Sequence, residues 1–202
     1  MKTVRTQGVV LRYTNFKEAD RMLTVFSPER GKMQVLARGC RKPKSRLLAA
    51  SQLFCYADYM FVRSKEIYVL TQADIRNSFY DIRNDVERLA YGTHILYLTE
   101  EAVNYEEGNF RLFYMLLQAL AYLAYGDINP EDVVHVFELK LTDILGYRPV
   151  LDRCTVCGSR IEDLNTNRLY FSVSQSGIIC SNCNKHVRSG YTIHKNTIQT
   201  MR

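Results

Sequence analysis

The chain has 202 residues, of which 47% are hydrophobic and 24% charged, as in an ordinary globular protein. This length allows one or two domains with a substantial core. The longest apolar stretch, residues 112–125, is interrupted by Gln118 and is too short to cross a bilayer. Residues 1–5 lead into no export signal, so we expect a cytoplasmic protein without a membrane segment.

The formal net charge of +6 is unevenly distributed along the chain. Residues 1–80 carry a balance of +9, residues 81–150 a balance of −7, and residues 151–202 a balance of +4. The basic first segment favours a polyanionic partner. The acidic middle is not expected to bind DNA in the same way.

The first 80 residues show the alternation of short β-strands. Five strands are expected, near residues 4–11, 22–26, 32–38, 53–63 and 66–75. This pattern predicts a small Greek-key barrel, of which the OB-fold is the commonest nucleic-acid-binding form, although another small barrel would also fit. Cys55, in the fourth strand, is expected to be a small core residue.

From about Asp81 the hydrophobic period changes to that of helices. Helices are expected near residues 86–97, 110–123 and 130–145, the last with Pro130 at its first position. Most tyrosines of this region are expected in the core. They include Tyr91, Tyr97, Tyr114, Tyr122 and Tyr125. A further helix is expected from Thr192.

Four cysteines form two matched pairs, Cys154 with Cys157 and Cys180 with Cys183, separated by 22 residues. A β-hairpin can return the chain over that gap, so that four thiolates meet in the tetrahedron that Zn²⁺ prefers. A disulfide framework is one alternative, but nothing indicates export. A redox site needs only one pair beside a βαβ pattern, and a catalytic zinc needs an open ligand position. We therefore predict one structural zinc ion.

Five cations occur within nine residues between the third and fourth strands. They are Arg38, Arg41, Lys42, Lys44 and Arg46, and Arg12, Lys17, Arg21 and Lys32 could extend this patch. Since Gly39 and Pro43 disfavour a helix, we expect a loop that stands off the barrel and neutralises phosphates. The alternative is a solvated basic loop with no nucleic-acid role. Phe16 or Tyr56 could stack on bases, although burial is the expected state of each.

No catalytic arrangement is visible in the sequence. The four histidines lie in different parts of the chain, and there is neither a phosphate-binding glycine loop nor a Gly-x-Ser-x-Gly motif. We expect a protein that is not an enzyme and takes no small-molecule substrate.

Several motifs resemble the bacterial RecO family of recombination mediators. They are residues 8–12, 18–24, 31–46 and 137–158, so the resemblance spans nearly the whole chain. It implies an α+β multi-domain protein with an OB-fold barrel in residues 1–80, a helical domain in 81–150 and an inserted four-cysteine zinc ribbon in 151–190. Residues 191–202 would begin a C-terminal helical segment, since the family generally runs ~40–50 residues longer.

The resemblance also implies a function in DNA repair and homologous recombination. Such a protein binds single- and double-stranded DNA, anneals complementary strands and helps to load recombinase onto DNA coated by single-strand-binding protein. Its partners would be RecR and the acidic C-terminal tail of single-strand-binding protein, and it would associate with the nucleoid. The family's DNA contacts lie in the stretch occupied here by the five clustered cations, to which we add Arg12, Arg21 and Lys32. The alternative is an interaction scaffold that binds acidic protein tails, with incidental DNA binding.

Overall fold

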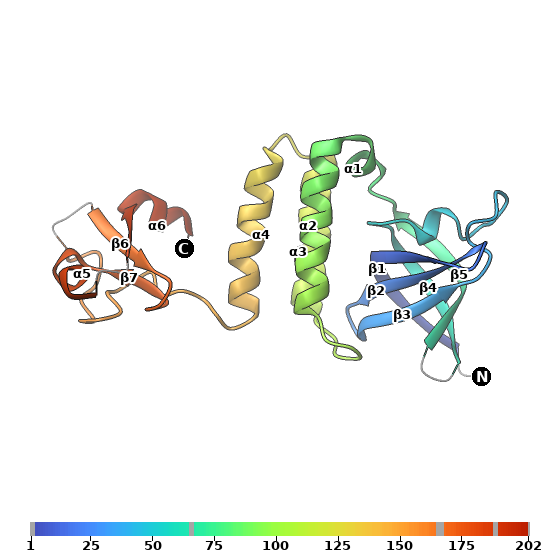
Figure 1. Cartoon of the computed structure of the whole chain (residues 1–202), viewed down its shortest axis with the longest axis horizontal. Helices are drawn as coiled ribbons and strands as arrows, with labels where there is room; N and C mark the ends of the chain where they lie inside the picture. The colour runs from blue at the N-terminus through green and yellow to red at the C-terminus, as the bar shows by residue number, and fades with distance from the viewer. Residues whose placement is uncertain (1–2, 65–66, 165–167, 188–189, 202) are drawn as a thin grey trace. The chain divides into compact units, whose positions relative to one another are not determined.

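The computed structural model describes residues 3–64, 67–164, 168–187 and 190–201, so Glu66, the expected start of the fifth strand, lies outside it. The chain divides into two compact units between Glu138 and Leu139. The first unit holds a β-barrel followed by helices, and the second holds a small sheet (Figure 1). No helix among the described residues is long and apolar enough to span a membrane. The domain limits expected at residues 80, 150 and 190 stay predictions.

Five strands close the barrel, coloured blue to teal in Figure 1. They are β1 (Thr3–Phe16), β2 (Asp20–Ser27), β3 (Gly31–Ala37), β4 (Tyr56–Ser64) and β5 (Ile67–Asn77). Their order is β1-β2-β3-β5-β4, and all neighbouring strands pair antiparallel except β3 with β5. This closed five-stranded barrel confirms the predicted OB-type fold.

The barrel interior is filled by alternate residues of its strands, as the period of two requires. On β4, Ala57, Tyr59 and Phe61 are fully buried, and the rings of Tyr59 and Phe61 stack with centroids 5.6 Å apart. Cys55 is also fully buried, which confirms its predicted place in the core. The strand begins at Tyr56 rather than Leu53, because Phe54 has a left-handed φ of 68° that interrupts the extended backbone.

Four helices follow the barrel. They are α1 (Tyr80–Asn84), α2 (Val86–Ala102), α3 (Phe110–Tyr125) and α4 (Pro130–Ile144). Asp85 caps α2 by accepting a hydrogen bond from the Arg88 amide, and Asn109 caps α3 in the same way. Helix α3 packs on the barrel through Phe113, whose ring centroid lies 5.4 Å from that of Phe26 on β2.

The expectation that the helix tyrosines lie in the core is wrong for four of them. The side chains are exposed by 54–59% and belong to Tyr97, Tyr114, Tyr122 and Tyr125. The buried stripe of α3 is made instead by aliphatic residues and Phe113. A phenol can stay partly in water because its hydroxyl remains solvated.

The second unit has a three-stranded sheet with β6 in the middle. Its strands are β6 (Arg168–Ser172), β7 (Gly177–Ile179) and β8 (Tyr191–His194), in the order β7-β6-β8, and its helices are α5 (Ser181–Val187) and α6 (Lys195–Met201). The prediction of a helix from Thr192 is wrong at its start. Ile193 pairs with Leu169 across the sheet, so this β-branched segment forms an edge strand and the helix begins at Lys195.

Candidate nucleic-acid interface and metal centre

The four paired cysteines lie together in the second unit. Their sulfur atoms all lie within 4.8 Å of one another, and those of Cys157 and Cys180 are 3.8 Å apart, too far for a disulfide. The first pair forms a turn in which the amide of Gly158, with a φ of 76°, donates to the Cys154 carbonyl at 2.9 Å. Cys180 directly follows β7, and Cys183 lies on α5. The arrangement offers four sulfur ligands to one metal ion.

The electrostatics of the cluster favour a cation. A hydrogen bond with the Ser159 hydroxyl, 3.3 Å from the sulfur, lowers the pKa of Cys157 to about 6. A hydrogen bond with the Cys180 sulfur raises the pKa of Cys183 to about 12, because it stabilises the neutral thiol. The Cys180 amide also points at the Cys154 sulfur, 3.3 Å away. Four thiolates at these distances repel one another unless a positive ion binds between them.

The five clustered cations lie on a loop of successive turns that follows β3. Their side chains are exposed and have no hydrogen-bond or ion-pair partner within the described part of the chain. The expectation that this loop stands off the barrel is wrong. The Gly39 amide donates to the Asp20 carboxylate at 2.7 Å, the Arg41 amide donates to the Ala19 carbonyl at 3.0 Å, and Cys40 is fully buried. These contacts tie the loop to the β1–β2 turn and leave its charges in solvent.

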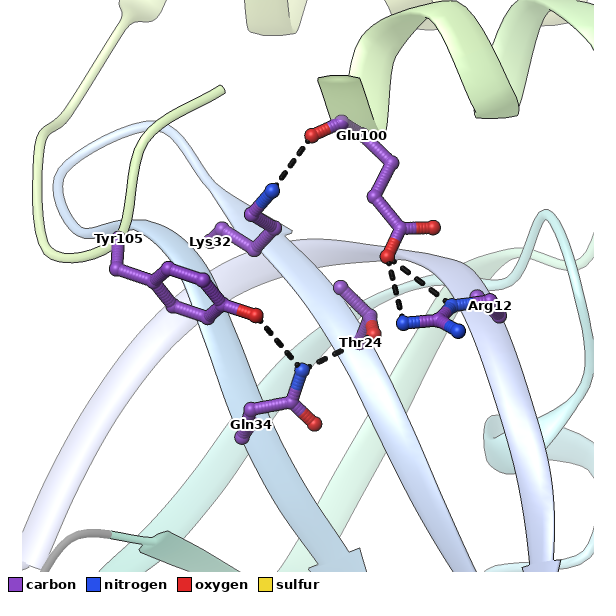
Figure 2. A network of polar contacts seen from close by, with 6 residues as sticks. All are labelled: Arg12, Thr24, Lys32, Gln34, Glu100 and Tyr105. Atoms are coloured by element: carbon purple, nitrogen blue, oxygen red, sulfur yellow. Dashed lines mark hydrogen bonds and ion pairs between the residues drawn. The ribbon is translucent and has the colours of Figure 1, made fainter. Parts of the chain in front are cut away.

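Arg12 and Lys32 contact the helical layer, here the end of α2 and the segment that follows it, as Figure 2 shows. The Arg12 guanidinium makes an ion pair with Glu100 of α2 at 2.9 Å. The Lys32 ammonium donates to the Glu100 carbonyl at 2.7 Å and lies 4.9 Å from the centroid of the Tyr105 ring. The Tyr105 hydroxyl lies 3.1 Å from the amide nitrogen of Gln34. Both cations therefore join the barrel to the end of α2 and the segment after it. Sequence reasoning missed Glu100 and Tyr105, because these contacts join residues far apart in the chain.

Arg21 is buried inside the barrel end. Its guanidinium donates to the Ser51 carbonyl at 3.0 Å and stacks on the Tyr13 ring, 3.9 Å from the centroid. Its exposed fraction is only 9%, and its Nε has no hydrogen-bond partner among the described residues. The structure thus gives Arg21 a packing role, and it separates this residue from the exposed cations of the loop.

Two family models match the chain in sequence order. One, described as "Recombination protein O N terminal", covers residues 1–79, and the other, "Recombination protein O C terminal", covers residues 83–202. The chain belongs to the RecO family. The DNA repair protein RecO of Acetivibrio thermocellus is 38% identical over 183 residues, which cover 91% of this chain and 71% of the relative. That of Desulforamulus reducens is 35% identical over 202 residues, which cover all of this chain and 77% of the relative.

The two RecO regions follow the architecture closely. The first takes in the barrel and the basic loop, and the second begins within α1 and takes in the later helices and all four clustered cysteines. Membership of the RecO family places the chain among DNA repair and recombination proteins. The predicted family resemblance is therefore confirmed.

Proposed function

We propose that this protein binds single- and double-stranded DNA through its basic loop, residues 38–46, and promotes annealing of complementary strands. The observation that supports this most directly is the state of the five loop cations. They are exposed, lack side-chain partners in the described part of the chain, and lie on a backbone fixed to the β1–β2 turn. Such groups can neutralise phosphates without first breaking contacts within the protein.

Arg12, Arg21 and Lys32 are assigned a lesser part in this proposal. Each already uses its charge inside the first unit, on Glu100 or on Ser51 and Tyr13. A phosphate would have to displace these contacts, whereas it would only displace water from the loop cations. We therefore place the principal phosphate contacts on Arg38, Arg41, Lys42, Lys44 and Arg46.

Annealing by such a protein requires no bond chemistry. Two complementary strands repel each other through their phosphates, and a bound cationic surface lowers that repulsion while it holds the strands close together. We propose that the protein acts in this way and is not an enzyme. By family membership we also propose RecR and the acidic tail of single-strand-binding protein as partners, recombinase loading as the outcome, and the cytoplasmic nucleoid as the location.

We further infer that the ion held by the cysteines is Zn²⁺ and that its role is structural. Four sulfur ligands are the donor set that zinc prefers in closed sites, and they leave no position for a reactive water. The ion would join the turn at Cys154 to the start of α5, across a unit whose buried core cluster contains few residues. These are Leu151, Ile161, Leu169, Ile178 and Ile198. Elemental analysis of the reduced, purified protein tests this directly: about one zinc per chain is expected, and a folded protein without metal would contradict it.

The test of DNA binding compares two triple variants. The first replaces Arg41, Lys42 and Lys44 by Ala. The second is a control that removes the same charge from the barrel strands outside the loop, with Arg5, Arg63 and Arg76 replaced by Ala. In the unmodified protein Arg63 and Arg76 form ion pairs with Glu106 and Asp58. Affinity for an oligonucleotide and annealing rate are measured over a range of salt concentrations.

We expect the loop variant to bind single-stranded DNA more weakly, whatever the sequence of the strand. The plot of log affinity against log salt should become less steep by about 2, since each lost phosphate contact contributes about 0.7 to the steepness. The control should keep most of the affinity and the annealing rate. If both triple variants lose affinity equally, the binding depends on net charge alone and the assignment to the loop is wrong.

A further inference from the structure

The outer surface of strands β1, β2 and β3 is divided into a covered half and an open half. Residues such as Leu23, Val25 and Val35 point into the core, so their strand neighbours point outward. Arg12, Thr24 and Gln34 face one another in register across the three strands. This row lies under Glu100 and Tyr105 in Figure 2, and it marks where the helical layer covers the sheet.

Beyond this row the three strands continue toward the β1–β2 turn. The next row is Thr14, Met22 and Leu36, and the last pairs Phe16 with Asp20, beside the end of β3. The Phe16 side chain is 41% exposed, contrary to the expectation that it is buried. Tyr56, the other aromatic considered for stacking, packs against Phe113 with ring centroids 6.0 Å apart, and its hydroxyl donates to Gln7 at 2.9 Å. Phe16 is thus the more exposed of these two aromatics, and its ring packs against no other aromatic ring in the described part of the chain.

An open pocket of about 650 Å³ lies between this turn and the basic loop. It is lined by residues 17–20 of the turn and by Arg38, Gly39 and Lys42 of the loop. Three cations face two carboxylates there, and one of these, Asp20, already accepts the Gly39 amide at 2.7 Å. The pocket can therefore accept an anion, and its two walls are joined by the Gly39–Asp20 hydrogen bond and by the backbone hydrogen bond from Arg41 to Ala19.

Lys17 links the pocket to Phe16. It lines the pocket, adopts a left-handed φ of 53°, and places its ammonium 5.5 Å from the centroid of the Phe16 ring. An aromatic face and a phosphate ligand therefore come from consecutive residues. Phe16 on β1 and the end of β3 are two strand spacings apart, about 10 Å.

We propose that Phe16 stacks on a base of single-stranded DNA whose neighbouring phosphates lie on Lys17, Arg38 and Lys42. This rests on the proposed DNA binding by the basic loop and gives that surface its means of distinguishing DNA forms. Phosphates are available in both forms, but a base can stack on a side chain only where its face is not covered by neighbouring bases. Phe16 therefore favours single strands, while the cations bind either form.

The first experiment compares Phe16→Ala with Phe110→Ala. Phe110 is a matched control, because it is 53% exposed and begins α3. Affinities are measured for a single strand, for the duplex of the same sequence and for an abasic strand of the same length. Phe16→Ala should lose about 5- to 150-fold in single-strand affinity, the effect of one stacked base. Its affinity for the duplex and the abasic strand, and its salt slope, should stay unchanged. Phe16→Tyr should restore single-strand binding.

A second measurement does not depend on affinity. The chain contains no tryptophan, so Phe16→Trp introduces a single indole fluorophore. Its emission should be quenched by a bound single strand and not by a bound abasic strand. Unchanged emission at saturation, or an equal loss of single-strand and duplex affinity in Phe16→Ala, would overturn the stacking role. If the unmodified protein shows no salt-dependent affinity for any DNA, the proposed function itself fails instead.

Discussion

Two glycines with the same backbone conformation offer a measurement of how strongly the barrel is joined to the helical layer. Gly31 and Gly39 have φ values of 61° and 63°, which disfavour any other residue to a similar extent. A Cβ at Gly39 would have no neighbour closer than 3.8 Å. A Cβ at Gly31 would lie 2.5 Å from the Asn104 carbonyl oxygen and still closer to that of Glu107. Only Gly31 therefore tests the contact with the segment after α2.

The expected magnitudes follow from these geometries. Gly39→Ala should cost about 1–2 kcal/mol, for the left-handed conformation alone. Gly31→Ala adds the displacement of the segment after α2, typically about 1–3 kcal/mol for an overpacked site. It also strains the hydrogen bond from the Lys32 amide to the Asn104 carbonyl, 2.9 Å long, which contributes about 1 kcal/mol. We expect Gly31→Ala to lower the free energy of unfolding by about 2–4 kcal/mol more than Gly39→Ala.

Urea denaturation followed by far-ultraviolet circular dichroism measures both variants, with the dependence of the free energy on urea checked for two-state behaviour. Equal destabilisation of the two variants would refute the reasoning, since it would mean that the segment after α2 is not packed on Gly31.

Three further outcomes are expected. A chelator that removes the proposed zinc ion should abolish amide-exchange protection in the second unit and leave the barrel protected. Retained protection in both units would show that the second unit needs no metal to fold, and Cys157→Ser provides the same test without a chelator. Phe113→Ala should destabilise the first unit by about 3–5 kcal/mol, whereas the exposed Tyr114→Ala should change stability by about 0.5 kcal/mol, as measured by thermal or urea unfolding; similar values would place the α3–barrel contact elsewhere. Glu100→Gln should release Arg12 from its ion pair and make log DNA affinity fall more steeply with log salt, by up to about 1. An unchanged steepness would mean that Arg12 does not reach DNA.

The barrel and the cysteine cluster could be predicted because their signals are local. Alternating apolar residues show a strand within a few positions, and paired cysteines at short spacing carry their chemistry with them. The burial of Arg21 could also have been predicted from the sequence. It stands in alternation with Leu23 and Val25, both of which are fully buried, so its register already placed it on the inner face of β2.

Other features depend on contacts that no local pattern contains. The register of β1 shifts at a bulge between Val10 and Arg12, and this directs Arg12 outward to Glu100. No pattern in the sequence predicted this bulge. Helical periodicity likewise indicates that α3 has an apolar face, but it does not show which aromatic side chains touch the barrel and which remain in solvent. The split between free and engaged cations is of this kind, because it follows from tertiary partners.

The placement of the six thiols has a consequence for how the protein responds to oxidants. Cys40 and Cys55 are fully buried in the barrel, and burial raises the pKa of the Cys55 thiol. Cys157 is exposed at the surface of the second unit. An electrophile that meets the folded protein therefore reaches the cysteine cluster before the buried thiols of the barrel. Oxidation would therefore begin at the proposed metal site, whereas the two thiols of the barrel are shielded by their burial.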